Sequence, residues 1–432
     1  MIFIKAESEI EKQLCSQFLI KVGILYHEDV LFSYKKEGNK NLIVFEILDK
    51  NRNEIIQKKK LIIDSPIMSY LLENFSLKKE AQFKKDNFGR SVKESNSVMH
   101  KEPLIDREII EIRQKVVNFL KSYDLDFSED FYPKKPTVCL THDVDSLKGK
   151  SFLRYLAWLL TSVFNGNFLI NLKKIFQFIN LKYDPHDSID YLINLEKKYG
   201  FKSTFFFLSL PFFISHEGRR YRLKKNKIKK LLKTIINKDM EIGLHTSRKG
   251  FRKSNYLKKE MERIVSVIGS NNLHGVRNHY LSGSFPNVWQ TYENTGLKYD
   301  SSLGWSDKMG YRAETSNPFF PIDLNTKKLF SIVEVPLIVM DCAIEEKNKN
   351  EILSDLIPFF DIARRQNSLI TILWHTDRIN NPEYASHSKA YKLILDQLKN
   401  FGFQSQTMDE VVSGFKKHYE VLKKNQAYEN NI

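Results

Sequence analysis

The chain has 432 residues, of which 42% are hydrophobic and 12% aromatic, too many for a disordered or collagen-like protein and enough for a sizeable core. Its 68 lysines and arginines outnumber 52 aspartates and glutamates, and this net charge of +16 permits contact with anionic polymers or membrane surfaces without identifying a partner. The three cysteines are too few for a disulfide framework or a zinc ribbon, and they fit a reducing compartment.

The start of the chain, MIFIKAESEIEKQL, carries charges where a signal peptide has an uninterrupted apolar run, so we expect a cytoplasmic protein. Residues 155–172 form the most apolar uncharged stretch, but asparagines and a glycine interrupt it. We expect a helical hairpin there. The alternative is a helix on a membrane surface, since basic residues flank the stretch.

Residues 1–134 are predicted to form a smaller N-terminal accessory domain of mixed α/β character. Apolar alternation at 42–48 and 60–63 indicates strands, and the polar stretch 76–102 indicates a loop or linker. The apolar spacing within 105–123 predicts an amphipathic helix. No motif in this region indicates its function.

Residues 135–432 show a different pattern, in which short apolar runs alternate with helical periods. This alternation predicts an α/β domain with a mostly parallel sheet, open or closed into a barrel. The expected strands are 137–141, 203–209, 241–245, 274–277, 332–339 and 369–375. The expected helices are 188–199, 225–236, 254–268, 288–295, 351–365 and 387–400.

Several expected strands end in polar residues capable of chemistry. The sequences at these ends are THDVD, LHTS, VRNHY and WHTD, at positions 141–145, 244–247, 276–280 and 374–377. In parallel α/β barrels, catalytic groups lie at the C-terminal ends of the strands. These endings are the strongest functional signal in the chain.

The residue types suggest a metal-assisted reaction. Asp143 and Asp145 are two residues apart on one strand, and their mutual repulsion favours a bound cation or proton, although Asp-x-Asp is also common in simple turns. His245 would complete an ordinary ligand set for a divalent ion, or be structural. His375 could act as a general acid, and Arg277 could hold a carboxylate ionised.

Together these motifs resemble the polysaccharide deacetylase superfamily, the NodB-homology group of carbohydrate esterases, over about residues 136–411. The resemblance implies a distorted (β/α) barrel whose members use a divalent metal to hydrolyse acetyl groups on sugars. It also implies that Asp143 is the catalytic base, that Asp145 and His245 are metal ligands, that Arg277 orients the base and that His375 is the general acid.

Three further segments are similar to a subgroup with an extra N-terminal region, often associated with cell-surface polysaccharide assembly. They are YDSSLG, GYRAETSNPF and VEVPLIVMD, at 299–304, 310–319 and 333–341. Arg312, in the second segment, either binds an anionic or polar sugar substituent or pairs structurally with a nearby acid.

The chain departs from the family pattern at one ligand. The second motif usually has two histidines four residues apart, but here Lys249 replaces the second. A catalytic zinc, the metal we expect, normally has three protein ligands. We predict His279 as the third, with His142 and Asp143 as alternatives.

The predicted function is hydrolysis of N- or O-linked acetyl groups on a carbohydrate or cell-surface polysaccharide precursor. One alternative is an inactive deacetylase-like protein that binds an anionic polysaccharide or a lipid-linked precursor through Arg248 and Lys249. Another is hydrolysis of a different carbon–nitrogen amide bond. Nucleic acid is not expected as a partner, because the basic runs 219–222 and 224–230 lack the interleaved aromatics of a single-strand platform.

Overall fold

The computed structural model describes residues 1–48, 59–78, 80–90, 101–147, 188–209, 221, 223–269, 272–344, 349–379 and 384–428. The apolar stretch 155–172, for which a helical hairpin was predicted, lies outside these residues, as does most of the basic run 219–222. Within the described part of the chain, no helix has both the length and the apolar character needed to cross a bilayer.

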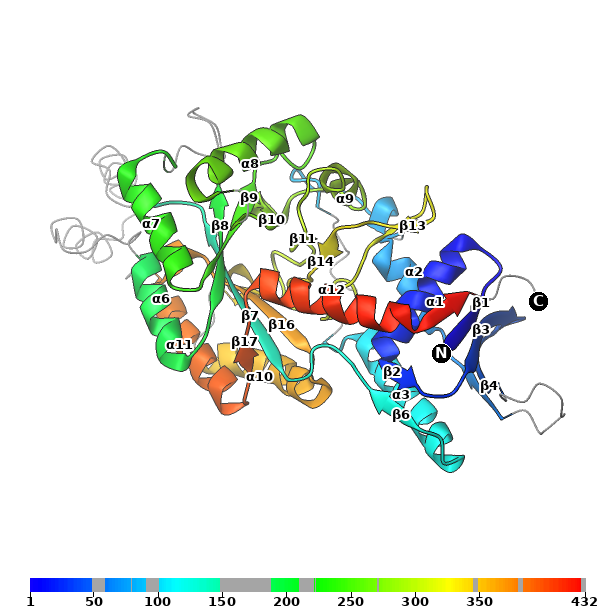
Figure 1. Cartoon of the computed structure of the whole chain (residues 1–432). Coiled ribbons are helices and arrows are strands. Elements are labelled where there is room, and N and C mark those ends of the chain that lie inside the picture. The colour runs from blue at the N-terminus through cyan, green and yellow to red at the C-terminus, as the bar shows by residue number, and fades with distance from the viewer. Residues whose placement is uncertain are drawn as a thin grey trace.

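A curled sheet of nine strands forms the larger part of the molecule (Figure 1). Its main path runs β14-β11-β10-β9-β8-β7-β16-β15, with β17 also paired to β7, and every one of these pairs is parallel. The strands are β7 (Thr137–Val144), β8 (Ser203–Leu208), β9 (Glu241–Thr246), β10 (Gly275–Asn278), β11 (Tyr299–Asp300), β14 (Val333–Glu334), β15 (Val339–Met340), β16 (Leu369–Leu373) and β17 (Gln404–Ser405). This arrangement confirms the predicted α/β class and its (β/α) barrel form.

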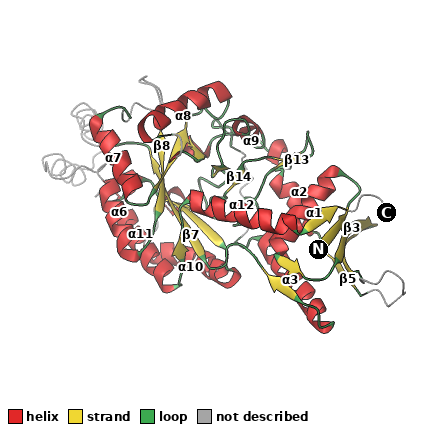
Figure 2. Cartoon of the chain, in the orientation of Figure 1, coloured by secondary structure: helices red, strands yellow, loops and turns green. Residues whose placement is uncertain are grey.

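Helices pack around the outside of this sheet (Figure 2). They are α6 (Ser188–Tyr199), α7 (Asn226–Asn237), α8 (Ser254–Ile268), α9 (Asn287–Tyr292), α10 (Lys349–Gln366), α11 (Ala385–Asn400) and α12 (Met408–Lys424). In α7, Ile228, Leu232 and Ile235 are buried while all of its lysines are exposed, which is the one-sided spacing that predicted a helix.

The predicted strand 332–339 forms two separate two-residue strands, β14 and β15, at opposite edges of the sheet path. Pro336 lies between them and has no amide hydrogen to donate to a ladder. Apolar composition alone therefore merged two strands that the chain separates.

The N-terminal part contains a mixed five-stranded sheet ordered β18-β1-β3-β4-β5. Its strands are β1 (Ile2–Lys5), β3 (Val30–Glu37), β4 (Lys40–Ile47), β5 (Lys60–Asp64) and β18 (Gln426–Tyr428), and its helices are α1 (Glu9–Val22), α2 (Ile67–Phe75), η1 (Glu80–Gln82) and α3 (Leu104–Ser122). Two small antiparallel pairs complete the structure: β2 (Ile24–Tyr26) with β6 (Phe127–Glu129), and β12 (Ile322–Asp323) with β13 (Lys328–Leu329). Because β18 pairs with β1, the C-terminal strand belongs to the N-terminal sheet.

The two parts share a buried boundary. The rings of Phe75 and Phe319 stack with centroids 4.1 Å apart. Asp106 accepts hydrogen bonds from Thr315 Oγ1 at 2.5 Å and from the Ser316 amide at 2.8 Å. The N-terminal region is thus packed against the barrel.

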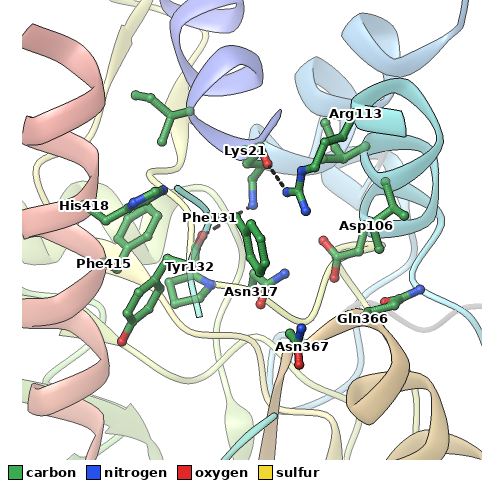
Figure 3. Close-up of a pocket in the computed structure, with 14 residues that line it drawn as sticks. Lys21, Asp106, Arg113, Phe131, Tyr132, Asn317, Gln366, Asn367, Phe415 and His418 are labelled. Carbon is green, nitrogen blue, oxygen red and sulfur yellow. Dashed lines mark hydrogen bonds between the residues drawn. The ribbon is translucent and has the colours of Figure 1, made fainter. Parts of the chain in front are cut away.

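A pocket at this boundary lies between α1, α3, α12 and the residues just before β16 (Figure 3). Arg113 crosses it to donate to the carbonyls of Lys21 and Val22 at 2.9 and 2.6 Å, at the C-terminal end of α1. Asn367 lines it near the N-terminal end of β16. The pocket is therefore away from the C-terminal strand ends, where the predicted catalytic residues lie.

Candidate metal centre

Three side chains from the ends of β7, β9 and β10 converge at the C-terminal edge of the sheet. Asp145 directly follows β7, His245 lies in β9, and His279 follows β10. Asp145 Oδ1 is 3.3 Å from His245 Nε2 and 3.5 Å from His279 Nε2. One potential ligand atom from each of the three lies within 4.8 Å of the others. The structure thus brings together the three residues predicted as metal ligands.

The hydrogen bonding of His245 fixes which nitrogen faces the cluster. Its Nδ1 is 3.0 Å from the carbonyl oxygen of Arg277, and because a carbonyl only accepts, Nδ1 must donate. In the neutral imidazole, Nε2 then presents its lone pair to Asp145. His245 Nε2 and Asp145 Oδ1 are then two acceptors 3.3 Å apart, which need a proton or a cation between them. A cation bound by both atoms meets that need.

The carboxylate of Asp145 is suited to bind a cation. Burial raises the pKa of Asp145, but when protons rather than a cation occupy the cluster, the hydrogen bonds and charges of the protonated His245 and His279 outweigh burial and hold that pKa well below its usual range. Two imidazoles and one carboxylate form a donor set ordinary for zinc or a similar divalent ion. The residues present therefore fit the expected metal.

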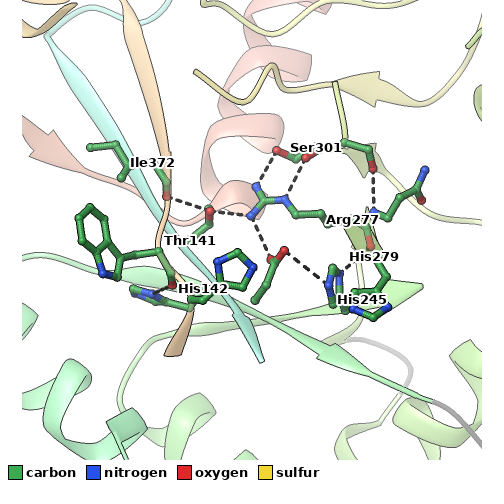
Figure 4. Close-up of polar contacts among 12 residues, drawn as sticks. Thr141, His142, His245, Arg277, His279, Ser301 and Ile372 are labelled. Carbon is green, nitrogen blue, oxygen red and sulfur yellow. Dashed lines mark hydrogen bonds and ion pairs between the residues drawn. The ribbon is translucent and has the colours of Figure 1, made fainter. Parts of the chain in front are cut away.

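Asp143 lies beside the cluster and contacts the guanidinium of Arg277, whose polar contacts are drawn in Figure 4. Arg277 Nη1 is 3.2 Å from Asp143 Oδ1, and Asp143 Oδ2 is 3.5 Å from His245 Nε2. Arg277 is fully buried, and it also donates to Thr141 Oγ1 at 2.7 Å and to the carbonyl and hydroxyl of Ser301 at 2.9 Å each. These partners fix the guanidinium, so that its position against Asp143 is set by the fold.

His375 follows β16 and pairs with Asp341, which follows β15. The Nδ1 of His375 is 2.8 Å from Asp341 Oδ1, and the His375 amide donates to Asp341 Oδ2 at 2.7 Å. Burial lowers the pKa of His375, but the charges of Asp341, Asp145 and Asp143 and the hydrogen bond to Asp341 raise it to about 10. His375 therefore carries a proton at neutral pH, as a general acid must.

Comparison with known proteins gives matches only among solved structures. No protein-family model matches the chain, and no curated protein matches it. A Mycobacterium smegmatis structure assigned to the polysaccharide deacetylases is 12% identical, with 67% of this chain and 93% of that chain covered at a TM-score of 0.44.

Two further matches are peptidoglycan deacetylases. PdaC from Bacillus subtilis is 15% identical, with 67% of this chain and 96% of that chain covered at a TM-score of 0.32. The catalytic domain of a peptidoglycan N-acetylglucosamine deacetylase from Eubacterium rectale is 10% identical, with 64% and 91% covered at a TM-score of 0.33.

All three of these proteins are described as deacetylases. At this identity and TM-score the likeness says nothing about substrate or mechanism, which must be argued from the residues of the site.

The alternative third ligands lie differently. Both ring nitrogens of His142 are occupied, Nδ1 with the Trp374 carbonyl and Nε2 with Glu196 Oε1, each at 2.8 Å, so His142 is a buried structural histidine. In Asp143, the Oδ1 atom already forms an ion pair with Arg277 Nη1. His279 is thus the candidate that the geometry favours.

The basic residues of the second motif point elsewhere. Lys249 is exposed, with its Nζ 5.9 Å from the centroid of the Tyr256 ring. Arg248 Nη2 donates to the carbonyl of Asn87 at 2.7 Å.

Arg312, in the segment 310–319, forms a buried double ion pair with Glu80 at 2.8 and 2.6 Å. This is the structural one of the two roles expected for it.

Asp341 was not singled out in the sequence, although it ends the VEVPLIVMD segment at a strand end as the other site residues do. Asp341, Cys342 and His375 also bring potential ligand atoms within 4.8 Å of one another. A cation is already present there, because Arg378 Nε is 3.5 Å from Asp341 Oδ2 and Arg378 Nη2 is 3.2 Å from Cys342 Sγ. Of these two groups, Asp145, His245 and His279 are therefore the better candidate for holding a metal.

Proposed function

We propose that this protein is a metal-dependent deacetylase that hydrolyses N- or O-linked acetyl groups on a carbohydrate, such as a cell-surface polysaccharide precursor. The observation that carries the proposal is the convergence of Asp145, His245 and His279 beside the Asp143–Arg277 pair. A ligand set and a carboxylate base in adjoining positions are what hydrolysis by an activated water requires.

Zinc is the metal we propose, held by Asp145 Oδ1 and by the Nε2 atoms of His245 and His279. Three protein ligands with a position open to water are typical of catalytic zinc sites. When bound, the ion supplies Lewis acidity and lowers the pKa of a coordinated water. The His245 Nδ1 bond to the Arg277 carbonyl orients that imidazole for binding.

In this mechanism Asp143 accepts the proton of the attacking water, and Arg277 stabilises Asp143 in its charged form. The water oxygen bonds to the acetyl carbon, and the bond from that carbon to the sugar nitrogen or oxygen then breaks. His375 donates its proton to the departing atom, which leaves as a free amine or hydroxyl with acetate as the other product. Asp341 holds the His375 ring in place and favours its protonated form.

The test is acetate release from an N-acetylglucosamine oligomer by the zinc-loaded protein and its Asp143→Asn variant. Loss of a general base costs about 10²–10⁴-fold in rate. We expect a fall of that size in kcat, with zinc binding retained. Asp361→Asn is the matched control, because Asp361 forms an ion pair with Arg365 on α10, away from the site, and should leave the rate unchanged.

Full turnover by Asp143→Asn would contradict the proposed base. Binding of the oligomer by the zinc-loaded parent with no acetate released, there or from O-acetylated sugars, would favour the inactive sugar-binding alternative. Release of an amine without acetate from an amide that carries no acetyl group would favour the alternative in which the protein hydrolyses a different carbon–nitrogen bond.

A further inference from the structure

His279 begins a short turn, η3 (His279–Leu281), with an uncommon backbone. Tyr280 and Leu281 have φ angles of 61° and 49°, in the left-handed region that side chains with a β-carbon seldom adopt. Such conformations persist only where the surrounding structure holds them. The position of the His279 imidazole therefore depends on what packs against this turn.

Part of that packing comes from the N-terminal region, from a loop formed by residues 86–90. The ring of Phe88 lies against that of Tyr280, with centroids 5.0 Å apart, and Tyr280 stacks in turn on the His279 imidazole at 3.8 Å. The Phe88 carbonyl accepts from the Gly283 amide at 3.3 Å, and Arg90 Nη1 lies 3.5 Å from the Tyr280 carbonyl oxygen. The loop thus contacts the turn through the tilted Phe88–Tyr280 ring pair and through backbone atoms on either side of Leu281.

The 86–90 loop is itself well ordered by internal bonds. Asp86 Oδ1 accepts from the amides of Phe88 and Arg90 at 2.8 and 2.9 Å, and Asp86 Oδ2 accepts from Arg90 Nε at 2.6 Å. Gly89 has a φ of 79°, in the left-handed region that glycine adopts without strain. A loop closed in this way can act as a rigid support.

The barrel anchors the loop at two further points. Arg90 Nη1 donates to Ser306 Oγ at 2.6 Å, and Arg248 Nη2 donates to the Asn87 carbonyl at 2.7 Å while its guanidinium lies 5.3 Å from the centroid of the Phe88 ring. Arg248 directly precedes Lys249, the position at which the usual second histidine is replaced. The segment in which Lys249 replaces the usual histidine therefore holds the loop that packs on Tyr280, the residue after His279.

We propose that the 86–90 loop is a positioning element for His279, so that metal affinity in the barrel depends on the N-terminal region. This inference rests on the proposed metal site. Two ligands on successive helical turns would be held by their own helix, whereas His279 lies on a short left-handed turn and needs support from outside. Phe88 supplies that support by packing on Tyr280, which stacks on the His279 imidazole.

The test compares zinc dissociation constants, measured by competition with a chromophoric chelator, for the full chain and for Phe88→Ala, Phe88→Tyr and Lys84→Ala. Loss of a residue supporting a ligand typically weakens metal affinity 10–100-fold. We expect about that loss for Phe88→Ala. We expect parent affinity for Phe88→Tyr, which keeps the ring, and for Lys84→Ala, which changes an exposed residue of the same segment.

Circular dichroism of the metal-free variants shows whether each is folded. If Phe88→Ala does not fold, Arg90→Gln takes its place. It removes the guanidinium contacts to the Tyr280 carbonyl, Asp86 and Ser306 but keeps the Phe88 ring, and we then expect weakened zinc affinity in a folded protein. Parent affinity in a folded Phe88→Ala or Arg90→Gln protein would overturn the positioning role alone. A parent that binds no zinc would overturn the proposed function as well.

Discussion

The barrel and the N-terminal region contribute to the candidate site in different ways. The barrel supplies the reactive groups, and Asp143, Asp145, His245 and His279 all lie at or just beyond the C-terminal ends of parallel strands. The N-terminal region supplies none of these groups, but its Phe88 packs on the turn that carries His279. The fold thus places the donor atoms at strand ends, and in the proposed arrangement a distant part of the chain supports one of these residues, His279.

The largest expected effect comes from breaking the boundary between the two regions. Arg312→Ala leaves Glu80 buried without its guanidinium partner, and loss of one member of a buried ion pair typically costs about 3–5 kcal/mol. We expect a fall of that size in the free energy of unfolding, measured by chemical denaturation.

Arg107→Ala is the matched control, because its ion pairs with Glu102 and Glu111 are exposed and such pairs contribute about 0–1 kcal/mol. Equal effects of the two substitutions would show that the Glu80–Arg312 pair does not join the regions energetically.

A smaller effect is expected within the barrel from Asp341→Asn. The pKa of His375 is raised to about 10, so His375 is protonated below that pH and loses its acid form as the pH rises through it. Removing the Asp341 charge lowers this pKa, so the alkaline limb of the pH–rate profile should move to lower pH.

NMR titration of the His375 ring in the metal-free protein measures the same change without turnover. Asp361→Asn should leave both readouts at the parent value. An alkaline limb that stays in place in Asp341→Asn would argue against His375 as the general acid.

The smallest expected effect is that of Lys249→Ala. Because Lys249 is exposed and directed toward Tyr256, we expect zinc affinity within about twofold of the parent value, a difference well below the 1.4 kcal/mol of a tenfold change. Chelator competition measures it. Lost binding of an anionic glycan, with zinc affinity unchanged, would instead support the role considered for Lys249 in an inactive binding protein.

The barrel was largely predictable from the sequence because its signals are local. Apolar runs and helical periods marked elements such as β8 and α8, and polar residues at the strand ends marked Asp145, His245 and His375. Pro336 is also a local signal, because its missing amide hydrogen separates β14 from β15 within the run 332–339, which was predicted as one strand.

The support for the site was not predictable, because it depends on contacts between residues distant in the chain. Nothing in the polar stretch 76–102 indicates that Phe88 meets Tyr280, almost 200 residues later, since neither residue belongs to a periodic pattern. Asp341 lies at a strand end, but its pairing with His375 depends on β15 and β16 being neighbours in the sheet. Tertiary contact, rather than composition, defines these roles.

The central claim, a metal held by Asp145, His245 and His279, is tested most directly by zinc content. The protein and its His245→Ala and His279→Ala variants are loaded with zinc, dialysed and measured by elemental analysis alongside Lys249→Ala. We predict about one zinc per chain in the parent and in Lys249→Ala, and loss of most of it in both histidine variants, as expected for three protein ligands reduced to two. A parent without zinc, or a His279→Ala variant that retains it fully, would contradict the account.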